Sequence, residues 1–294
     1  VKKGFLMNKM IDKMILKYNP KSLDESINAL REIFQQITLL ALWRTNFYEN
    51  AAFYGGTALR ILHNLDRYSE DLDFSLLKPD KNFDISFFTD LIQKEINAYG
   101  FNVTVEKKQK KFSSNTESAF LKTDTIKKLL IIESLNKSSY KIPSNQILKI
   151  KIEIDINPPG GFNTEIKYLY EPIPFTVNVY SLPDLFAGKL HAVLCRKWQN
   201  RVKGRDWYDL LWYCINHPVV NLNHLRLRLI DSGHLKKESE FDLLILKKLL
   251  HEKIKEVNFD QIKLDIMPFI KNGEQVKLWN ENLFLDVIKR VKEQ

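Results

Sequence analysis

Cysteine is scarce in this chain, and its scarcity argues against two classes of protein. Only Cys195 and Cys214 occur among 294 residues, and both lie among apolar neighbours. A disulfide-stapled secreted fold is therefore not expected, and the pattern predicts two buried free thiols in a reducing cytoplasm. No Cys-x-x-Cys pair occurs and the six histidines are scattered, so the sequence predicts no zinc site.

Long apolar runs and a P-loop are also missing. The longest uncharged apolar-rich run, residues 33–43, is too short and too polar to cross a bilayer. The basic N-terminus is not followed by the apolar stretch of a secretory signal. We therefore expect a soluble cytoplasmic protein without a membrane partner. No Gly-x-x-x-x-Gly-Lys-Ser/Thr sequence occurs, so a P-loop ATPase is not supported.

Acidic residues are in deficit, with 36 acidic against 45 basic residues and a net charge of +9. Lysine and arginine displace the counterions around phosphates, so this excess permits a polyanionic ligand. A basic surface that is merely solvated is the alternative, and charge alone does not separate the two. The apolar content of 44% allows a sizeable core, and the length suggests one large or two ordinary domains.

Residues 53–77 carry the clearest chemical pattern, with the sequence of a strand, a Gly-Gly turn, a helix, a polar loop and a second strand. Alternation along that second strand places Asp71 and Asp73 on one face. Two neighbouring carboxylates repel each other, and a divalent cation removes that penalty. Mg²⁺ is bound by one or two carboxylates plus substrate phosphates, so the pair predicts a site for Mg²⁺ or Mn²⁺.

Phosphate-binding features precede the acidic pair. Gly55 and Gly56 allow a tight turn and leave room for a ligand. Thr57 lies where a helix begins, and the free backbone N–H groups of a helix start attract phosphate. The stretch therefore predicts the nucleotide site of a phosphoryl-transfer enzyme.

The whole pattern resembles the signature of the AbiEii/AbiGii-type toxin family, whose members are polymerase-β-like nucleotidyltransferases. A lone Asp-x-Asp is weak evidence, but a Gly-Gly turn at this distance before Arg-x-Ser-x-Asp-Leu-Asp is specific. The resemblance implies that Asp71 and Asp73 are catalytic metal ligands. It also implies a set of nucleotide-binding residues, namely Gly55, Gly56, Thr57, Arg60, Arg67 and Ser69.

Residues 148–158 form the clearest strand pattern, in which four isoleucines alternate with polar residues. Glu153 and Asp155 lie on its polar face. A polymerase-β-like site commonly takes a third carboxylate from a neighbouring strand, so the resemblance makes Glu153 or Asp155 a further metal ligand, without choosing between them. The alternative is an ordinary solvent-facing edge of a sheet.

A second block of the family pattern lies in the predicted helix over residues 181–198. Lys189 stands where the family has a lysine, within Leu-x-x-x-Lys-Leu-x-Ala-x-x-x-Arg. The resemblance implies that Lys189 contacts the nucleotide triphosphate and belongs to the catalytic set.

A third element, Lys-x-Arg-Asp-x-Tyr-Asp, follows directly, and its aspartates, Asp206 and Asp209, are one helical turn apart. In the family an acid of this block completes the site, and we favour Asp206, with Asp209 as second choice. The alternative is that they cap a helix or pair with Arg205. The surrounding basic residues predict contacts with an RNA backbone: Arg196, Lys197, Arg201, Lys203 and Arg205.

Hydrophobic periodicity predicts the remaining elements. Helices are expected over residues 23–48, 57–64, 84–99, 222–231, 239–256 and 279–292, and strands over 72–76 and 101–106, with further strands within 118–135. The resemblance implies an α+β fold class, with a polymerase-β-like mixed sheet and flanking helices followed by a helical C-terminal domain. The predicted domains span residues 1–178 and 179–294.

The resemblance further implies a function. It describes a toxin of a toxin–antitoxin or phage-abortive system that transfers a nucleotide from an NTP to RNA, with tRNA as acceptor, by a two-metal mechanism. A cognate antitoxin neutralises it. The site is expected to be split, with Lys189 and Asp206 near Asp71. Two alternatives stay open: transfer to a protein or small-molecule hydroxyl, and a non-catalytic nucleotide- or RNA-binding module.

Overall fold

The computed structural model describes residues 2–99, 101–107, 125–134, 147–196 and 203–294. Its contacts divide the chain into two units. Unit 1 comprises Val1–Leu62, Ser69–Pro158 and Ile166–Val179, and unit 2 comprises His63–Tyr68, Pro159–Glu165 and Tyr180–Gln294. Unit 2 thus takes two short segments from the stretch predicted to form the first domain.

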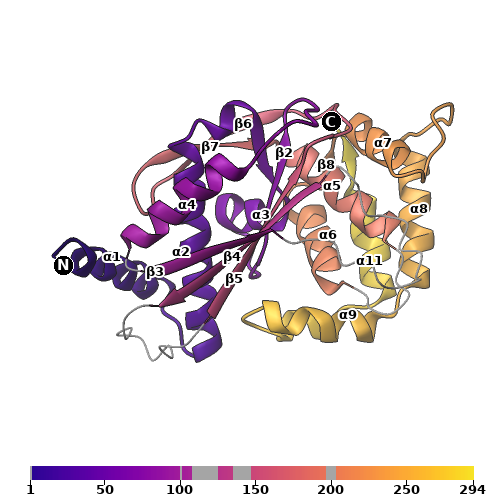
Figure 1. Ribbon diagram of the computed structural model, residues 1–294. Coiled ribbons are helices and arrows are strands. Elements are labelled where there is room, and N and C mark those ends of the chain that lie inside the picture. Colours follow the sequence, from indigo (N-terminus) through magenta and orange to yellow (C-terminus); the bar gives the residue numbers. More distant parts are fainter. Residues whose placement is uncertain (1, 100, 108–124, 135–146, 197–202) are drawn as a thin grey trace, which may run out of the picture. The chain divides into compact units, whose positions relative to one another are not determined.

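A seven-stranded mixed sheet forms the centre of unit 1, in the order β3-β4-β5-β2-β1-β7-β6 (Figure 1). Strand β2 pairs antiparallel with β1 and parallel with β5, while β4 pairs antiparallel with both β3 and β5. The strands are β1 (Ala51–Tyr54), β2 (Leu72–Leu76), β3 (Phe101–Lys107), β4 (Thr125–Ser134), β5 (Ile147–Asp155), β6 (Thr164–Leu169) and β7 (Phe175–Tyr180).

Helices flank this sheet (Figure 1). They are α1 (Lys2–Tyr18), α2 (Leu23–Trp43), α3 (Gly55–His63) and α4 (Ser86–Ala98), with a short 3₁₀ turn, η1, at Phe47–Glu49. Helix α2 begins at the predicted cap, where the Ser22 hydroxyl accepts a hydrogen bond from the N–H of Glu25 at 3.1 Å. It packs against α4 and β5. The sheet therefore has one face covered by long amphipathic helices.

The buried apolar side chains of β2 determine which way the side chain of Asp73 points. Phe74 is fully buried, and its ring centroid lies 5.1 Å from Phe47 and 5.3 Å from Phe53. Leu72 is also fully buried. Because side chains alternate along a strand, burial of these residues directs the intervening aspartate to the other face.

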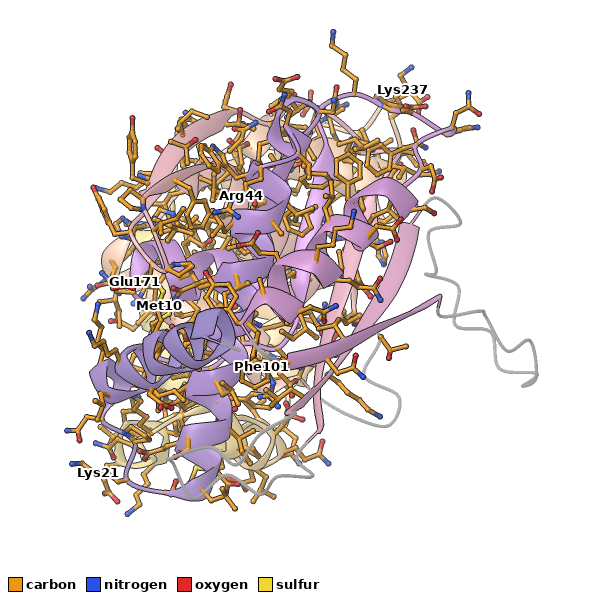
Figure 2. All side chains as sticks on the ribbon, turned by 60° about the vertical axis from the view of Figure 1, so that its left-hand side comes forward. Met10, Lys21, Arg44, Phe101, Glu171 and Lys237 are labelled. Carbon is orange, nitrogen blue, oxygen red and sulfur yellow. The ribbon has the colours of Figure 1, made fainter. Side chains whose placement is uncertain are left out.

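Two surface ion pairs connect elements of unit 1. Arg44, labelled in Figure 2, lies 2.6 Å from Glu95, which joins the end of α2 to α4. Glu171, also labelled, pairs with Lys17 of α1. Exposed pairs of this kind contribute little to stability, so the buried apolar face remains the main cohesive element of the unit.

Unit 2 is mainly helical in its described part (Figure 1). Helix α6 packs against α5 and α9, and α5 packs against α7. A short parallel pair, β8 (Val219–Val220) and β9 (Lys292–Glu293), lies near the C-terminus. The helices are α5 (Leu182–Cys195), α6 (Gly204–Asn216), α7 (Leu222–Asp231), α8 (Leu243–Glu256), α9 (Phe259–Ile266), α10 (Glu274–Lys277) and α11 (Glu281–Val287), with 3₁₀ turns η2 (Met267–Phe269) and η3 (Ile288–Arg290).

The predicted fold class is confirmed: a mixed sheet with flanking helices precedes a helical C-terminal region. Strands β6 and β7 were not predicted. The last helix ends at Val287 rather than near residue 292, since the final residues pair with β8. The lysine-rich sequence of residues 107–118 predicts a hairpin loop or a basic loop, and all of it except Lys107 lies outside the described residues. None of the helices in the described ranges has both the length and the apolar character that a bilayer span requires.

Candidate active site

Three acidic residues of unit 1 come from the adjacent parallel strands β2 and β5. The register pairs Asp73 with Glu153 and Leu72 with Ile152. Asp71 precedes β2 by one residue and shares the parity of Asp73, so all three carboxylates belong to the face opposite the apolar core. The side chains of Asp71 and Glu153 are 35% and 23% exposed, which leaves them accessible to an ion.

A lysine lies among these acids. Lys151 Nζ is 3.2 Å from Asp71 Oδ2 and 3.0 Å from Glu153 Oε1. Burial alone would lower the pKa of Lys151, but the two carboxylates outweigh it and the pKa is raised, so the ammonium stays charged. The face therefore already attracts and holds a cation between two of its acids. The sequence analysis did not single out Lys151, although strand alternation places it on the same face as Glu153.

The register distinguishes the two candidates for the third carboxylate. Glu153 is directly opposite Asp73, whereas Asp155 is opposite Ser75, two residues further along β5. Two residues correspond to roughly 6.6 Å along a strand. Asp155 is only 6% exposed, and its Oδ1 accepts the N–H of Asn157 at 3.2 Å. The geometry thus favours Glu153 as the acid nearest the Asp71–Asp73 pair.

The Gly-Gly turn contacts the acidic face directly. Gly55 has a φ of +83°, and a Cβ added to it would lie 2.4 Å from Asp73 Oδ2. Glycine is therefore required there both by backbone conformation and by space. Helix α3 begins at this residue, so the first N–H groups of the helix lack intrahelical partners and are suited to an anion.

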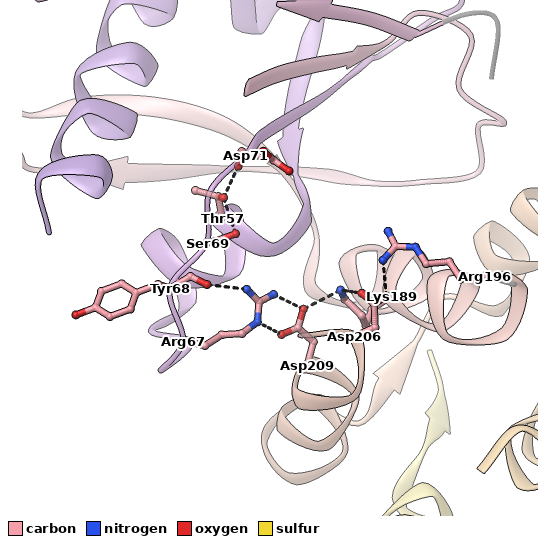
Figure 3. Close-up of polar contacts among 9 residues, drawn as sticks. All are labelled: Thr57, Arg67, Tyr68, Ser69, Asp71, Lys189, Arg196, Asp206 and Asp209. Atoms are coloured by element: carbon pink, nitrogen blue, oxygen red, sulfur yellow. Dashed lines mark hydrogen bonds and ion pairs between the residues drawn. The ribbon is translucent and has the colours of Figure 1, made fainter. Parts of the chain in front are cut away.

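Thr57 and Ser69 hold the loop that carries Asp71 (Figure 3). The Thr57 hydroxyl donates to the backbone carbonyl of Asp71 and lies 2.9 Å from Ser69 Oγ. Thr57 is fully buried, and the Ser69 carbonyl accepts a hydrogen bond from Gln35 at 3.1 Å. The Thr57 side chain therefore orients Asp71, while its backbone N–H belongs to the start of α3.

Arg60, predicted to bind nucleotide, is engaged within unit 1. Its Nε lies 2.8 Å from Glu32 Oε2 of helix α2, and Glu32 also accepts a hydrogen bond from Tyr18 at 3.0 Å. Both partners of the ion pair are about one-eighth exposed, at 13% and 12%. This pair connects α3 to α2, and a contact of Arg60 with nucleotide stays a prediction.

A buried ion-pair network lies within unit 2 (Figure 3). Arg67 forms a bidentate pair with Asp209, with two N–O distances of 2.6 Å, and donates to the Tyr68 carbonyl at 3.0 Å. The side chains of Arg67 and Asp209 are 2% and 0% exposed. Burial would lower the pKa of Arg67, but Asp209 outweighs it and keeps the guanidinium charged. This ion pair therefore connects the segment His63–Tyr68 to helix α6 within unit 2.

Lys189 joins both aspartates of the second block. Its Nζ lies 2.7 Å from Asp206 Oδ1 and 2.8 Å from Asp209 Oδ2, and Arg196 pairs with the other oxygen of Asp206. Burial would raise the pKa of Asp206, but Lys189 and Arg196 outweigh it and lower the pKa to about 2. Three cations and two anions leave this network with a formal charge of +1. The structure thus brings together Lys189, Asp206, Asp209, Arg67 and Arg196 within unit 2, while proximity of Lys189 and Asp206 to Asp71 stays a prediction.

The predicted RNA-binding patch is only partly described. Arg196 is 42% exposed and Lys203 is exposed. The Arg205 guanidinium lies 4.2 Å from the centroid of the Phe269 ring, a cation–π distance. Lys197 and Arg201 lie outside the described residues. The described cations therefore include side chains already engaged with the protein, and their contact with RNA stays a prediction.

Comparison with known proteins places the chain in a class. A model of the family described as "Nucleotidyl transferase AbiEii toxin, Type IV TA system" matches residues 37–282, most of the chain. Together with the mixed sheet and its acidic face, this match defines the protein as a nucleotidyltransferase. The chain belongs to the AbiEii nucleotidyltransferase toxin family of type IV toxin–antitoxin systems, which confirms the resemblance.

A solved structure shows a similar fold. JHP933 from Helicobacter pylori matches with a TM-score of 0.51 and 17% identity, over 90% of this chain and 89% of that one. A candidate nucleotidyltransferase from H. pylori matches with a TM-score of 0.48 and 18% identity, over 88% of this chain and 91% of that one. At such identities the likeness shows the fold alone. Among curated proteins no sequence matches significantly.

Proposed function

We propose that this nucleotidyltransferase moves a nucleotide from an NTP to a hydroxyl of an RNA acceptor, with tRNA as the acceptor, by a two-metal mechanism. One observation carries the proposal: Asp71, Asp73 and Glu153 share an accessible face of neighbouring strands, beside a helix N-terminus. This arrangement offers carboxylates for divalent ions and backbone N–H groups for phosphate.

The acidic face fits a divalent cation. Lys151 already places a positive charge between Asp71 and Glu153, and Gly55 leaves the space beside Asp73 that a side chain would fill. Nucleotidyltransferases generally use an NTP and a divalent metal. Mg²⁺ or Mn²⁺ bound here would supply charge stabilisation for the attacking and leaving oxygens of the phosphoryl group.

Other residues would position the substrate. The Gly55–Gly56 turn and the N-terminal N–H groups of α3 would bind phosphate, and Thr57 and Ser69 would keep Asp71 in place. Lys189 would offset negative charge on the triphosphate, because its side chain is 13% exposed whereas that of Arg67 is 2% exposed. Asp206 and Asp209 would hold the Lys189 ammonium in position.

The family also implies a partner, and we propose that a cognate antitoxin neutralises the growth arrest caused by this activity. The test is expression of the chain in a bacterial host with and without the neighbouring gene product. Growth arrest that requires Asp71 and is relieved by co-expression supports the toxin role. Arrest that persists in Asp71→Asn argues against a catalytic cause.

The activity is tested with purified protein, labelled NTPs, Mg²⁺ and either total RNA or purified tRNA. We expect label in RNA with the wild type and none with Asp71→Asn or Asp73→Asn. Equal labelling by all three proteins would overturn the site assignment. Label in protein or in a small molecule, but not in RNA, would support the alternative acceptors, and nucleotide binding without transfer would support a binding module.

A further inference from the structure

A second cluster of metal-ligating side chains lies in unit 2, at the C-terminal end of α5. His191 and Cys195 are four residues apart on this helix and therefore lie on one side of it. His234 comes from the turn after α7, a helix that packs against α5. The ligating atoms of these three residues all lie within 4.8 Å of one another.

The backbone fixes the position of His234. Gly233 has a φ of +73°, and the N–H groups of His234 and Leu235 both donate to the Leu229 carbonyl, at 2.8 and 3.1 Å. Turns with a left-handed glycine end helices in this way. The third ligand is therefore held by main-chain hydrogen bonds and not only by its side chain.

The hydroxyl of Ser232 contacts both histidines of the cluster. Its Oγ lies 2.8 Å from His191 Nε2 and 3.0 Å from His234 Nδ1. It also donates to the Leu229 carbonyl at 3.2 Å. In a tetrahedral zinc site, ligand atoms are roughly 3.5 Å apart, so closure by about 1 Å and rotation of the Ser232 side chain about its Cα–Cβ bond, away from the two imidazoles, would form one.

We infer that His191, Cys195 and His234 form a zinc site, with a fourth position open to water or to another ligand. Two imidazoles and one thiolate suit Zn²⁺ and related transition-metal ions, whereas Mg²⁺ prefers oxygen ligands. This inference reverses the expectation from the sequence. The sequence lacks Cys-x-x-Cys, and His234 comes close to His191 and Cys195 only because α7 packs on α5.

Binding would change the state of the thiol. Burial raises the pKa of Cys195 to about 12 in the metal-free chain, although Ser232, Arg228 and Lys253 act in the opposite direction. The thiol gives its proton to solvent as the sulfur–zinc bond forms, so one proton is released for each ion bound. Cys195 is the last residue of α5 and precedes Arg196, so an ion here would fix the helix end next to the Lys189–Asp206 network.

Co²⁺ provides a spectroscopic test as a proxy for Zn²⁺. The metal-free protein is titrated with Co²⁺ in excess Mg²⁺, and Zn²⁺ is then added. We expect one equivalent of Co²⁺ to give a thiolate-to-cobalt charge-transfer band and the intense visible bands of a tetrahedral site, both bleached by Zn²⁺. Absence of a stoichiometric charge-transfer band in the wild type would overturn the inference.

Variants assign the ligands. Cys195→Ser should abolish the charge-transfer band, and His234→Ala, at an exposed position, should weaken Co²⁺ binding at least ~10-fold. Cys214→Ser, the matched control at the other buried cysteine, should leave the spectrum unchanged. The band should also persist in Asp71→Asn. Loss of the band in Asp71→Asn or Cys214→Ser, or its retention in Cys195→Ser, contradicts the assignment of the thiolate, and unchanged Co²⁺ affinity in His234→Ala contradicts the assignment of the third ligand.

Discussion

Gly55 shows how a single residue couples backbone conformation to the chemistry of the acidic face. Its φ is +83°, and an added Cβ would lie 2.4 Å from Asp73 Oδ2. We expect Gly55→Ala to lose about 1–2 kcal/mol of unfolding free energy, the cost of a left-handed conformation. Displacement of the Asp73 carboxylate should also reduce nucleotide transfer by about 100-fold. Urea unfolding and the labelled-NTP assay measure the two effects.

The matched control is Gly160→Ala. Gly160 has a similar φ of +74°, but nothing lies within 4 Å of the position that its Cβ would take. The variant should therefore show the same loss of stability without loss of activity. An equal loss of activity in both variants would attribute the effect of Gly55→Ala to stability and not to Asp73.

Asp206 gives the unit 2 network a defined pH dependence. Despite burial, Lys189 and Arg196 lower its pKa from an ordinary value of 3.8 to about 2. Because the folded-state pKa lies below the unfolded-state value, the stabilisation is complete above about pH 4 and is lost as the pH falls to about 2. The difference corresponds to about 2 kcal/mol.

The measurement compares unfolding free energies in urea across this pH range. Between about pH 4 and pH 2, the wild type should lose about 2 kcal/mol more than Asp206→Asn, which cannot titrate there. Asp90→Asn, at an exposed position on α4, serves as the control and should follow the wild type. Parallel curves for the wild type and Asp206→Asn would show that the carboxylate does not stabilise the network.

At the scale of elements, the register between β2 and β5 selects the third carboxylate. Glu153 is opposite Asp73, and Asp155 is opposite Ser75. We expect Glu153→Gln to lower the transfer rate at least ~100-fold, since loss of even an outer-shell partner costs up to that amount. Asp155→Asn keeps the acceptor for the N–H of Asn157 and should retain activity. The opposite result, with Asp155→Asn inactive and Glu153→Gln active, would identify Asp155 and not Glu153 as the third carboxylate.

Helix α6 contacts α9 so closely that only glycine fits at its first residue. A Cβ on Gly204 would lie 2.4 Å from the Ile262 carbonyl oxygen, whereas one on Gly188 in α5 would lie 3.9 Å from its nearest neighbour, Arg228. Gly204→Ala should therefore cost about 1–3 kcal/mol. Gly188→Ala should gain about 0.5–1 kcal/mol from higher helix propensity. Thermal and urea unfolding of the two variants test this contrast, and destabilisation of both to the same extent would refute it.

The same two glycines show what the sequence could and could not predict. Helix propensity alone marks Gly188 as costly in a helix, but the need for glycine at Gly204 depends on a backbone from another helix. In β5, alternation predicted that Glu153 and Asp155 share a face, but it cannot show which of the two is the third carboxylate of the site. Only the pairing of β5 with β2 distinguishes them. Local patterns thus predicted β2, β3, β5 and the acidic pair but not β6 and β7, while contacts between distant segments determined the partners of Lys151 and His234.

For the whole molecule, net charge alone does not define an RNA-binding surface. The chain carries a net charge of +9, yet Lys189, Arg196 and Arg67 are paired with two aspartates. The charge available to a polyanion is therefore smaller near this network than the composition implies. RNA binding should therefore depend on which cations are exposed and not on the net charge alone.

Lys203 tests this idea, because it is exposed, lies in the predicted patch and directly precedes α6. The affinity for tRNA, measured without NTP, should fall as salt rises, because phosphate contacts release counterions. Lys203→Ala should reduce the slope of log affinity against log salt by about 0.7–0.9, the value for one lost contact. Lys237→Ala, at an exposed position outside the patch (Figure 2), is the matched control and should leave the slope unchanged. If both variants change the slope equally, the attraction comes from the overall charge and the patch has no special role.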